Sequence, residues 1–302
     1  MVNLNDIKIT KRDGRLEPLN ISKINRVLEW AAEGLNVSTS NVEMNAKFQF
    51  FNGISTEDIH DTLVKSAADL IDEDNPDYQL MAARLAVFKV RKDAYGDYNP
   101  PKLKDHVKRL IEEGWYNKEI KDFYTDNELD YLDEHINHSR DNNIRYAGIQ
   151  QMINKYLIQD RSTKRVKESP QMMFMLIGMC LYSKERFDRL EKIINFYNEI
   201  SQFRISLSTP IIAGVRSNNK FFTSCIVIDT DDHLNSINAS ANTIINYISR
   251  RAGIGINFGR IRAIGSKIRN GEATHTGIVP FIKHIETAVT SCHQGKINCS
   301  AY

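Results

Sequence analysis

The sequence changes character near Ile205, and this change limits the possible fold more than any other feature. Between residues 103 and 203 the apolar side chains recur mostly at helical spacing. After Ile205, the apolar runs "RISLSTPIIAGV", "FTSCIVIDT" and "IGINFGRIR" are typical of buried strands, and the stretches "LNSINASANTIINYISRRAG" and "VPFIKHIETAVTSC" are typical of helices. Strands interspersed with helices predict a parallel α/β layer or barrel. We therefore expect an α+β first part and an α/β last part.

The first 95 residues are expected to form a hairpin followed by about four helices. Asp13-Gly14 separates two strand-like runs, and this dipeptide suits a turn that needs a positive φ. Ser22 is the expected cap of the first helix, and Ser55 or Thr56 that of the third. The second and fourth helices are expected at about 39–51 and 77–94.

Pro100-Pro101 in "YGDYNPPKL" marks a domain boundary, because proline cannot continue a helix and forces the preceding residue into an extended conformation. A mainly helical domain is expected to follow. The predicted division is 1–95, 96–204, 205–295 and a tail at 296–302.

Composition narrows the class of protein. The 302 residues are 41% hydrophobic and carry a net charge of +2, so no polyanion partner such as nucleic acid is indicated. We found no apolar run of membrane-spanning length and no signal-peptide pattern at the N-terminus, so we expect a cytoplasmic protein without a membrane partner. The four cysteines show no metal-binding spacing, and no metal site is expected.

Two groups of cations are candidates for binding phosphates. Lys11, Arg12, Lys23 and Lys92 could surround a triphosphate, although spacing alone favours solvated surface side chains. A histidine such as His60 is, taken alone, more often structural than a ligand. The second group consists of the arginines around "AGIGIN", where two glycines would let the backbone approach a ligand closely; a tight strand entry with exposed arginines explains the pattern equally well.

Two further stretches leave alternatives open. Cys225 starts an expected strand, and it is either a small core residue or a redox thiol that faces a cleft. "STP" at 208–210 either cradles a phosphate or forms a plain turn.

Several stretches, in this order along the chain, together resemble one family. They are "TKRDG", "NISKINRVLEWAAEGL", "GISTEDIH", "PDYQLMAARLAVFKVRKDAYG", "ISLSTPIIAGVR", "LNSINAS", "SRRAGIGIN" and "GEATHTGIVPF". The chain resembles the large, catalytic subunit of class I ribonucleotide reductases from about Ile7 to Gly295, and it is most similar to the enterobacterial and T4-type phage enzymes.

The resemblance implies three domains and two effector sites. Residues 1–95 would be an ATP cone, 96–204 a helical domain, and 205–295 the start of a ten-stranded α/β barrel. ATP or dATP, with Mg, would bind the cone. The matching positions of this activity site are Lys11, Arg12, Glu17, Asn20, Lys23, Thr56, His60 and Lys92.

A second effector site, at a dimer interface of large subunits, would select the base that is reduced. Other deoxynucleotides would bind there, and the matching positions of this specificity site are Asp232, His233, Leu234, Arg262 and Arg269. Family members usually carry Ser where this chain has His233.

The resemblance also implies the active site and its reaction. Thr209, Ser224, Ala252 and Gly253 match substrate-binding positions, and Cys225 matches one of two cysteines that reduce the ribose. The two thiols become a disulfide that thioredoxin or glutaredoxin reduces again. A thiyl radical on a third cysteine starts the reaction, and it derives from a di-iron tyrosyl radical in a separate small subunit.

The resemblance stops before the barrel is complete. After "SCHQG" this chain has "KINCSAY", which departs from the family pattern. We therefore expect the N-terminal piece of a split large subunit, which is inactive alone and completed by a second chain that carries the remaining barrel and cysteines. If a phage encodes it, the host cytoplasm is its location. The alternative is a non-catalytic regulatory fragment that binds nucleotides.

Overall fold

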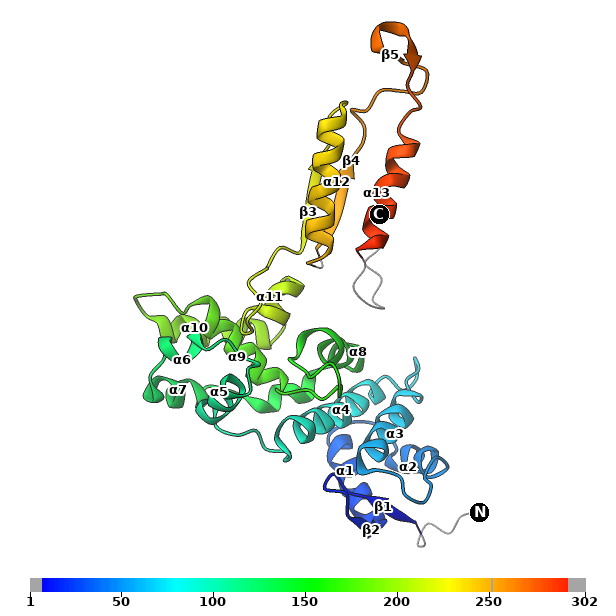
Figure 1. The fold of residues 1–302 in the computed structure, drawn as a ribbon. Coiled ribbons are helices and arrows are strands. Elements are labelled where there is room, and N and C mark those ends of the chain that lie inside the picture. Colours follow the sequence, from blue (N-terminus) through cyan, green and yellow to red (C-terminus); the bar gives the residue numbers. More distant parts are fainter. Residues whose placement is uncertain (1–6, 251, 293–302) are drawn as a thin grey trace. The chain divides into compact units, whose positions relative to one another are not determined.

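The structure, a computed structural model, describes residues 7–250 and 252–292. The chain divides into two compact units, Met1–Asn219 and Lys220–Tyr302. The chain trace and the element labels are drawn in Figure 1. Each unit has a hydrophobic core of its own, so each is described separately.

The first unit begins with the predicted hairpin. Strands β1 (Lys8–Thr10) and β2 (Leu16–Pro18) are antiparallel, with Ile9 opposite Glu17. Gly14 takes a φ of 83° in the connecting turn, where a residue with a side chain would be strained. Asp13-Gly14 therefore forms the turn as predicted.

The four predicted helices follow the hairpin. They are α1 (Ile21–Ala32), α2 (Thr39–Lys47), α3 (Thr56–Ala68) and α4 (Tyr78–Tyr95). Ser55 caps α3 as predicted, but the prediction that Ser22 caps α1 is wrong. Asn20 takes this role because it is the last extended residue, and its side chain accepts a hydrogen bond from the Lys23 amide at 3.2 Å. Helix α2 also ends earlier than the predicted residue 51.

Backbone contacts fix the hairpin beside the start of α3. The amide of Thr10 donates to the carbonyl of Ile54 at 2.9 Å, and that of Gly53 donates to Lys8 at 2.8 Å. Helices α3 and α4 pack against each other along their length (Figure 1). The turn after β1, the start of α3 and the end of α4 are thereby brought together.

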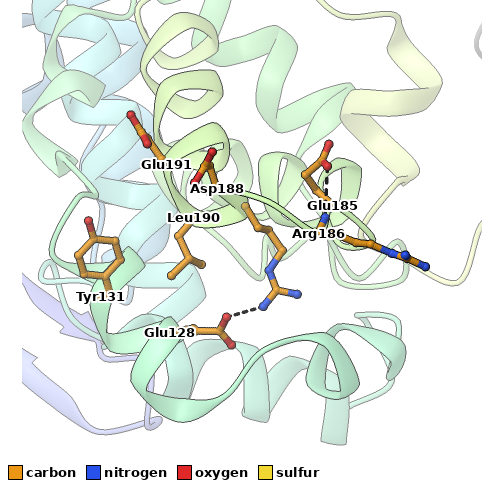
Figure 2. Close-up of a pocket in the computed structure, with 8 residues that line it drawn as sticks. Glu128, Tyr131, Glu185, Arg186, Asp188, Leu190 and Glu191 are labelled. Carbon is orange, nitrogen blue, oxygen red and sulfur yellow. Dashed lines mark hydrogen bonds and ion pairs between the residues drawn. The ribbon is translucent and has the colours of Figure 1, made fainter.

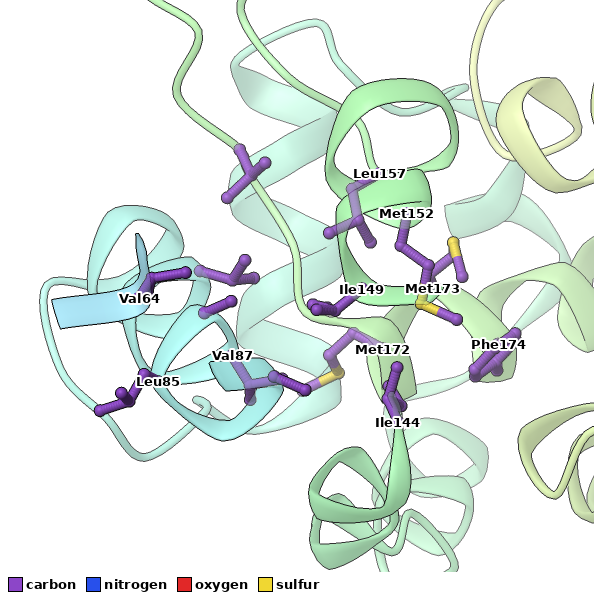
Figure 3. Packing of buried hydrophobic residues seen from close by; sticks show 14 of the residues in the cluster. Val64, Leu85, Val87, Ile144, Ile149, Met152, Leu157, Met172, Met173 and Phe174 are labelled. Carbon is purple, nitrogen blue, oxygen red and sulfur yellow. The ribbon is translucent and has the colours of Figure 1, made fainter. Parts of the chain in front are cut away.

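Helices make up most of the remaining first unit, as predicted. The elements are α5 (Leu103–Glu112), α6 (Glu119–Phe123), α7 (Asp126–Asp133), the 3₁₀ helix η2 (His138–Asn143), α8 (Tyr146–Gln151), the π-helix η3 (Met152–Tyr156), α9 (Pro170–Leu181), α10 (Arg189–Ser201) and α11 (Thr209–Gly214). Residues on α4, α8 and α9 share one buried cluster, in which Val87, Ile149 and Met172 lie close together (Figure 3). Helix α9 is apolar on nearly all sides because it runs through this core.

The predicted strand in "RISLSTPIIAGV" is wrong. Residues 209–214 form the short helix α11, with Pro210 in its first turn, where the missing amide costs nothing. A short apolar run fits a buried helix as well as a strand, and periodicity cannot separate the two.

The second unit contains the predicted parallel strands. Strand β3 (Cys225–Asp229) continues through α12 (Leu234–Ile248) into β4 (Gly253–Asn257), and the two strands pair in parallel. Helix α13 (Val279–Ser291) packs against α12. The short strands β5 (Lys267–Ile268) and β6 (Ala273–Thr274) flank the 3₁₀ helix η4 (Arg269–Gly271).

The β3–β4 sheet is covered on one face only. Ile226, Ile228 and Ile254 pack against the core of α12 and α13, whereas Val227 on the other face is 85% exposed. The prediction of a buried strand is therefore wrong for β3. Its alternating pattern follows from the period of two, which sends successive side chains to opposite faces.

Candidate functional site

The first cluster of candidate residues surrounds His60 on α3. Its imidazole stacks on the ring of Phe88 from α4, with the ring centroids 5.1 Å apart. Lys92, one turn further along α4, holds its Nζ 5.9 Å from the centroid of the Phe88 ring. Arg12 reaches the same end of α4 from the turn after β1, where it pairs with Asp93 at 2.6 Å. Three predicted residues from three segments thus meet at one end of α4.

The electrostatics of this cluster favour an anion. Burial lowers the pKa of His60 to about 4, and the positive charges of Arg12, Lys89 and Lys92 contribute to the same shift. The Nδ1 atom of His60 is buried and has no hydrogen-bond partner. Each of these cations has an acidic partner, at 2.6 Å for Arg12, 2.5 Å for Lys89 and 3.9 Å for Lys92, and a bound polyphosphate would compete with these carboxylates.

Two of the predicted lysines, Lys11 and Lys92, form only long ion pairs. Lys11 Nζ lies 3.8 Å from Glu17, and Lys92 Nζ lies 3.9 Å from Asp97. Exposed pairs of this length contribute little, so these lysines can turn to a ligand at small cost. The remaining candidates line the adjacent helix starts, with Asn20 and Lys23 at α1 and Thr56 at α3.

The second cluster lies between the ends of β3 and β4. The carboxylate of Asp232 accepts hydrogen bonds from Arg262, at 3.1 Å from its amide and 2.6 Å from its Nε. These contacts lower the pKa of Asp232, with the Arg262 amide as the largest cause. Arg260 joins the same loops through ion pairs to Asp229 and Asp231.

His233 acts as the N-cap of α12. Its Nδ1 accepts a hydrogen bond from the Ser236 amide at 3.2 Å, while the Ser236 hydroxyl accepts one from the Asp231 amide at 3.0 Å. A histidine thus performs the capping that a serine would perform at this position. The neighbouring Leu234 is exposed, and Arg269 begins η4 between β5 and β6.

The third cluster lies at the start of the parallel strands. Cys225 is exposed and stands in register with Gly253. A Cβ atom on Gly253 would lie 3.2 Å from the Cys225 Sγ, so this glycine keeps space beside the thiol. Ser224 accepts a hydrogen bond from the Gly253 amide at 2.8 Å, and its hydroxyl lies 3.8 Å from the thiol. Ala252 is fully buried next to this group.

Comparison with known families accounts for most of the chain, with residues 94–142 outside the matches. The family model described as "ATP cone domain" matches residues 7–93. "Ribonucleotide reductase, all-alpha domain" matches 143–220, and "Ribonucleotide reductase, barrel domain" matches 223–298.

The similar curated proteins compared below are alpha subunits of ribonucleoside-diphosphate reductases. The chain is 51% identical to ribonucleoside-diphosphate reductase 1 subunit alpha of Escherichia coli (strain K12) over 298 residues, which is 98% of this chain and 39% of that protein. This chain belongs to the family of class I ribonucleotide reductase large subunits. It is also 44% identical to the alpha subunit of Enterobacteria phage T4, over 98% of this chain and 39% of that protein. The Helicobacter pylori (strain J99) subunit is 34% identical over 92% of this chain and 35% of its own length.

The matches identify the N-terminal portion of a large subunit. The fold is accordingly an ATP cone, an all-α domain and the start of the barrel domain. The chain spans 39% of the length of its E. coli relative. The boundaries at 95 and 204 stay predictions, and the one at 295, like the tail 296–302, lies outside the described residues.

The predicted site residues of this large-subunit chain lie in both units. Of the substrate-site candidates, Thr209 begins α11 in the first unit, and Ser224, Ala252 and Gly253 lie in the second. The roles of all these residues remain predictions.

Sequence reasoning missed Phe88 and the aromatic group around it. The Phe88 ring lies 5.2 Å from Tyr98 and 5.8 Å from Trp30, measured between centroids. Phe88 precedes Lys92 by four residues on one helix face, and this spacing could have indicated a shared site.

A hollow elsewhere in the first unit coincides with none of these clusters. It has a volume of about 620 Å³ and lies between α7 and the start of α10 (Figure 2). Arg189 crosses it to pair with Glu128. Within the described residues, no helix is long and apolar enough to span a membrane, and no group of acidic, histidine or cysteine side chains forms a metal site.

Proposed function

We propose that this chain supplies the effector sites and one edge of the active site of a ribonucleoside-diphosphate reductase. The observation that carries the proposal is the exposed Cys225, which stands beside Gly253 on the uncovered face of a parallel strand pair. A thiol in this position can reach a substrate that lies over the strands.

Cys225 would act as one of two reducing thiols. The two thiols give up two electrons and two protons, the 2′-hydroxyl of the ribose leaves as water, and the sulfurs join in a disulfide. Thioredoxin or glutaredoxin would then restore the thiols by exchange. Among the described residues, Cys225 forms no disulfide, and its redox partner would come from the remaining barrel.

A complementary polypeptide would complete the barrel. Within the described residues, β3 and β4 pair only with each other, which leaves both outer edges open. Open edges present unpaired backbone groups that can accept further strands. The chain spans 39% of the length of its E. coli relative. We propose that a second chain supplies the remaining barrel and that this chain alone is inactive.

Nucleotide effectors would bind two of the clusters. ATP or dATP with Mg would occupy the cone, where the cations around the unpartnered His60 Nδ1 fit a polyphosphate. A deoxynucleotide effector would bind near Asp232, Arg262 and Arg269 at an interface between two large subunits. A small subunit would supply the di-iron tyrosyl radical, and the assembly would work in the cytoplasm, that of the host if a phage encodes it.

The experiment that tests this function mixes this chain with a polypeptide carrying the remaining barrel, the small subunit and a reductant. We expect dCDP to form from CDP in the mixture and not from this chain with the small subunit alone. Reduction by this chain alone would refute the proposed division. A mixture that assembles and forms no dCDP would refute the function.

A regulatory fragment is the second candidate, because all the predicted activity-site residues lie in the first unit. Such a fragment would bind ATP or dATP and change the activity of an intact large subunit. Titrating this chain into an intact reductase at fixed dATP tests it. Unchanged activity at saturating chain concentrations would exclude this role.

A further inference from the structure

A buried ion pair holds the end of α11. The side chains of Glu168 and Arg216 are both 0% exposed. The Nε of Arg216 lies 3.1 and 2.9 Å from the two carboxylate oxygens of Glu168, and its Nη2 makes a further contact. The guanidinium therefore faces the carboxylate over its whole edge.

Arg216 also binds three other segments. Its Nη2 donates to the carbonyl of Tyr156 at 2.8 Å, and its Nη1 donates to the carbonyl of Ile212 within α11. Its own carbonyl accepts a hydrogen bond from the Asn117 amide at 2.9 Å. The C-terminal end of α11 is thus fixed from several directions.

Glu168 is equally well held. The Ile158 amide donates to its Oε1 at 2.7 Å, and the Tyr116 hydroxyl donates to its Oε2. His106 Nε2 lies 2.9 Å from that hydroxyl. Burying two charges costs several kcal/mol of desolvation, so a pair of this kind is an inefficient source of stability. We therefore expect the ion pair to act mainly on the position of the segments that it joins.

The other end of α11 is exposed. Ser208 and Thr209 are exposed, and Ser208 makes no side-chain cap at this helix. Helix α11 has six residues and is therefore about 9 Å long. A shift at Arg216 would consequently reach the Thr209 hydroxyl through about two helical turns.

We propose that Glu168 and Arg216 are positioning residues that set the place of the Ser208 and Thr209 hydroxyls for the diphosphate of the substrate. This inference rests on the proposed function, in which Thr209 contacts a ribonucleoside diphosphate. The ion pair acts through α11 and does not touch the substrate.

The test compares Arg216→Lys with wild type in the assembled reductase. Lysine keeps the charge but cannot reach Glu168, Ile212 and Tyr156 together. We expect the KM for CDP to rise about tenfold while kcat stays within about twofold, since loss of position weakens binding of substrate and transition state alike. An unchanged KM in a folded enzyme would overturn the inference.

Arg91→Lys is the matched control. Arg91 forms another buried ion pair in the same unit, with Asp141 at 2.8 Å, and it has no contact with α11 among the described interactions. We expect a comparable loss of stability without a change in KM. An equal rise in KM for both variants would reduce the role of Arg216 to general stability and overturn the inference.

Three further measurements distinguish a variant that fails to fold, a wrong positioning role and a wrong proposed function. If Arg216→Lys does not fold, the double variant Glu168→Met/Arg216→Met removes both charges together, and it should fold and show the same rise in KM. Hydrogen exchange on this chain alone should show faster exchange of the 211–215 amides in Arg216→Lys, and unchanged exchange would overturn the positioning role. A wild-type assembly that forms no dCDP would instead refute the proposed function.

Discussion

Three histidines of the first unit lie where protonation is unfavourable. Burial is the largest cause in each case, and it lowers the pKa of His60 and His138 to about 4 and that of His106 to about 3. His106 shows the reason most clearly. Tyr116 donates its proton to Glu168, so His106 Nε2 must donate to Tyr116, and the buried Nδ1 has no partner for a second proton.

Stability should therefore fall as the pH falls. In the unfolded chain a histidine takes up its proton near pH 6.5, whereas folded His106 does so only near pH 3. Its contribution is fully present above pH 6.5 and is lost progressively between pH 6.5 and 3. We expect His106 alone to cost about 2 kcal/mol of unfolding free energy between pH 7 and 5.

Urea unfolding at the two pH values measures this loss. The variant His106→Gln should lose about 2 kcal/mol less than wild type between pH 7 and 5, whatever its stability at pH 7. Identical pH dependence in the two proteins would show that the pKa of His106 is the same in the folded and unfolded states, and would contradict the account.

Lys92 permits a test of the cone cluster. The variant Lys92→Gln removes one cation near His60 and breaks the long pair with Asp97 and the distant contact with the Phe88 ring, so stability should change little. We expect the affinity for dATP to fall about tenfold and to depend less on salt, because a charge-assisted phosphate contact is lost. Calorimetric titration at two salt concentrations measures both effects.

Lys102→Gln is the control for this variant. Lys102 is exposed and pairs with Asp133 away from the cone cluster. Equal losses of dATP affinity in the two variants would mean that general charge, and not a site at His60, attracts the nucleotide.

At the scale of elements, the parallel strand pair places two glycines on the face that carries Cys225. A Cβ atom on Gly253 would approach the Cys225 Sγ to 3.2 Å, whereas one on Gly255 would lie 3.9 Å from Val227, an ordinary contact. Neither glycine has a positive φ, so alanine is acceptable to the backbone at both positions.

Gly253→Ala should therefore displace the thiol, and Gly255→Ala should not. We expect the first variant to lower CDP reduction by the assembled enzyme about tenfold, as small displacements of reacting groups carry large costs in rate. The second should stay within about twofold of wild type. Comparable losses in both variants would mean that the space beside the thiol is unimportant.

The helices of the first 95 residues could be predicted from the sequence because their apolar spacing is regular. The parallel strands 225–229 and 253–257 were also predictable from their place around a helical stretch. Helix α11 was not, since its apolar run is too short to show a period. The cap at Asn20 was missed because Ser22, two residues later, is an equally suitable capping residue by type.

The candidate sites were predictable only in part. Lys92 was a candidate phosphate ligand by its charge, and His60 became one only through the family resemblance. The structure brings both to Phe88. The stacking of His60 on Phe88 joins side chains from two different helices, α3 and α4, so no local sequence pattern indicates it. The Glu168–Arg216 pair joins residues 48 positions apart, so no motif could indicate it.

At the scale of the whole molecule, the described chain combines a first unit built around one hydrophobic core with a strand pair that is covered on one face only. The first unit buries its helices in one core, whereas β3 exposes the face that carries Cys225. The exposed residues of β3 are Cys225, Val227 and Asp229, and an uncovered sheet face can pack against another layer of structure. The account therefore depends on a second polypeptide that covers this face and brings a second thiol.

A single-turnover reaction tests this central claim most directly. The assembled enzyme is mixed with CDP without thioredoxin, glutaredoxin or any other reductant, and the disulfides are then mapped by mass spectrometry. We predict that Cys225 forms a disulfide with a cysteine of the complementary polypeptide in step with dCDP, and that Cys225→Ser, an exposed substitution of little effect on stability, forms neither. Formation of dCDP while Cys225 remains a free thiol would contradict the account.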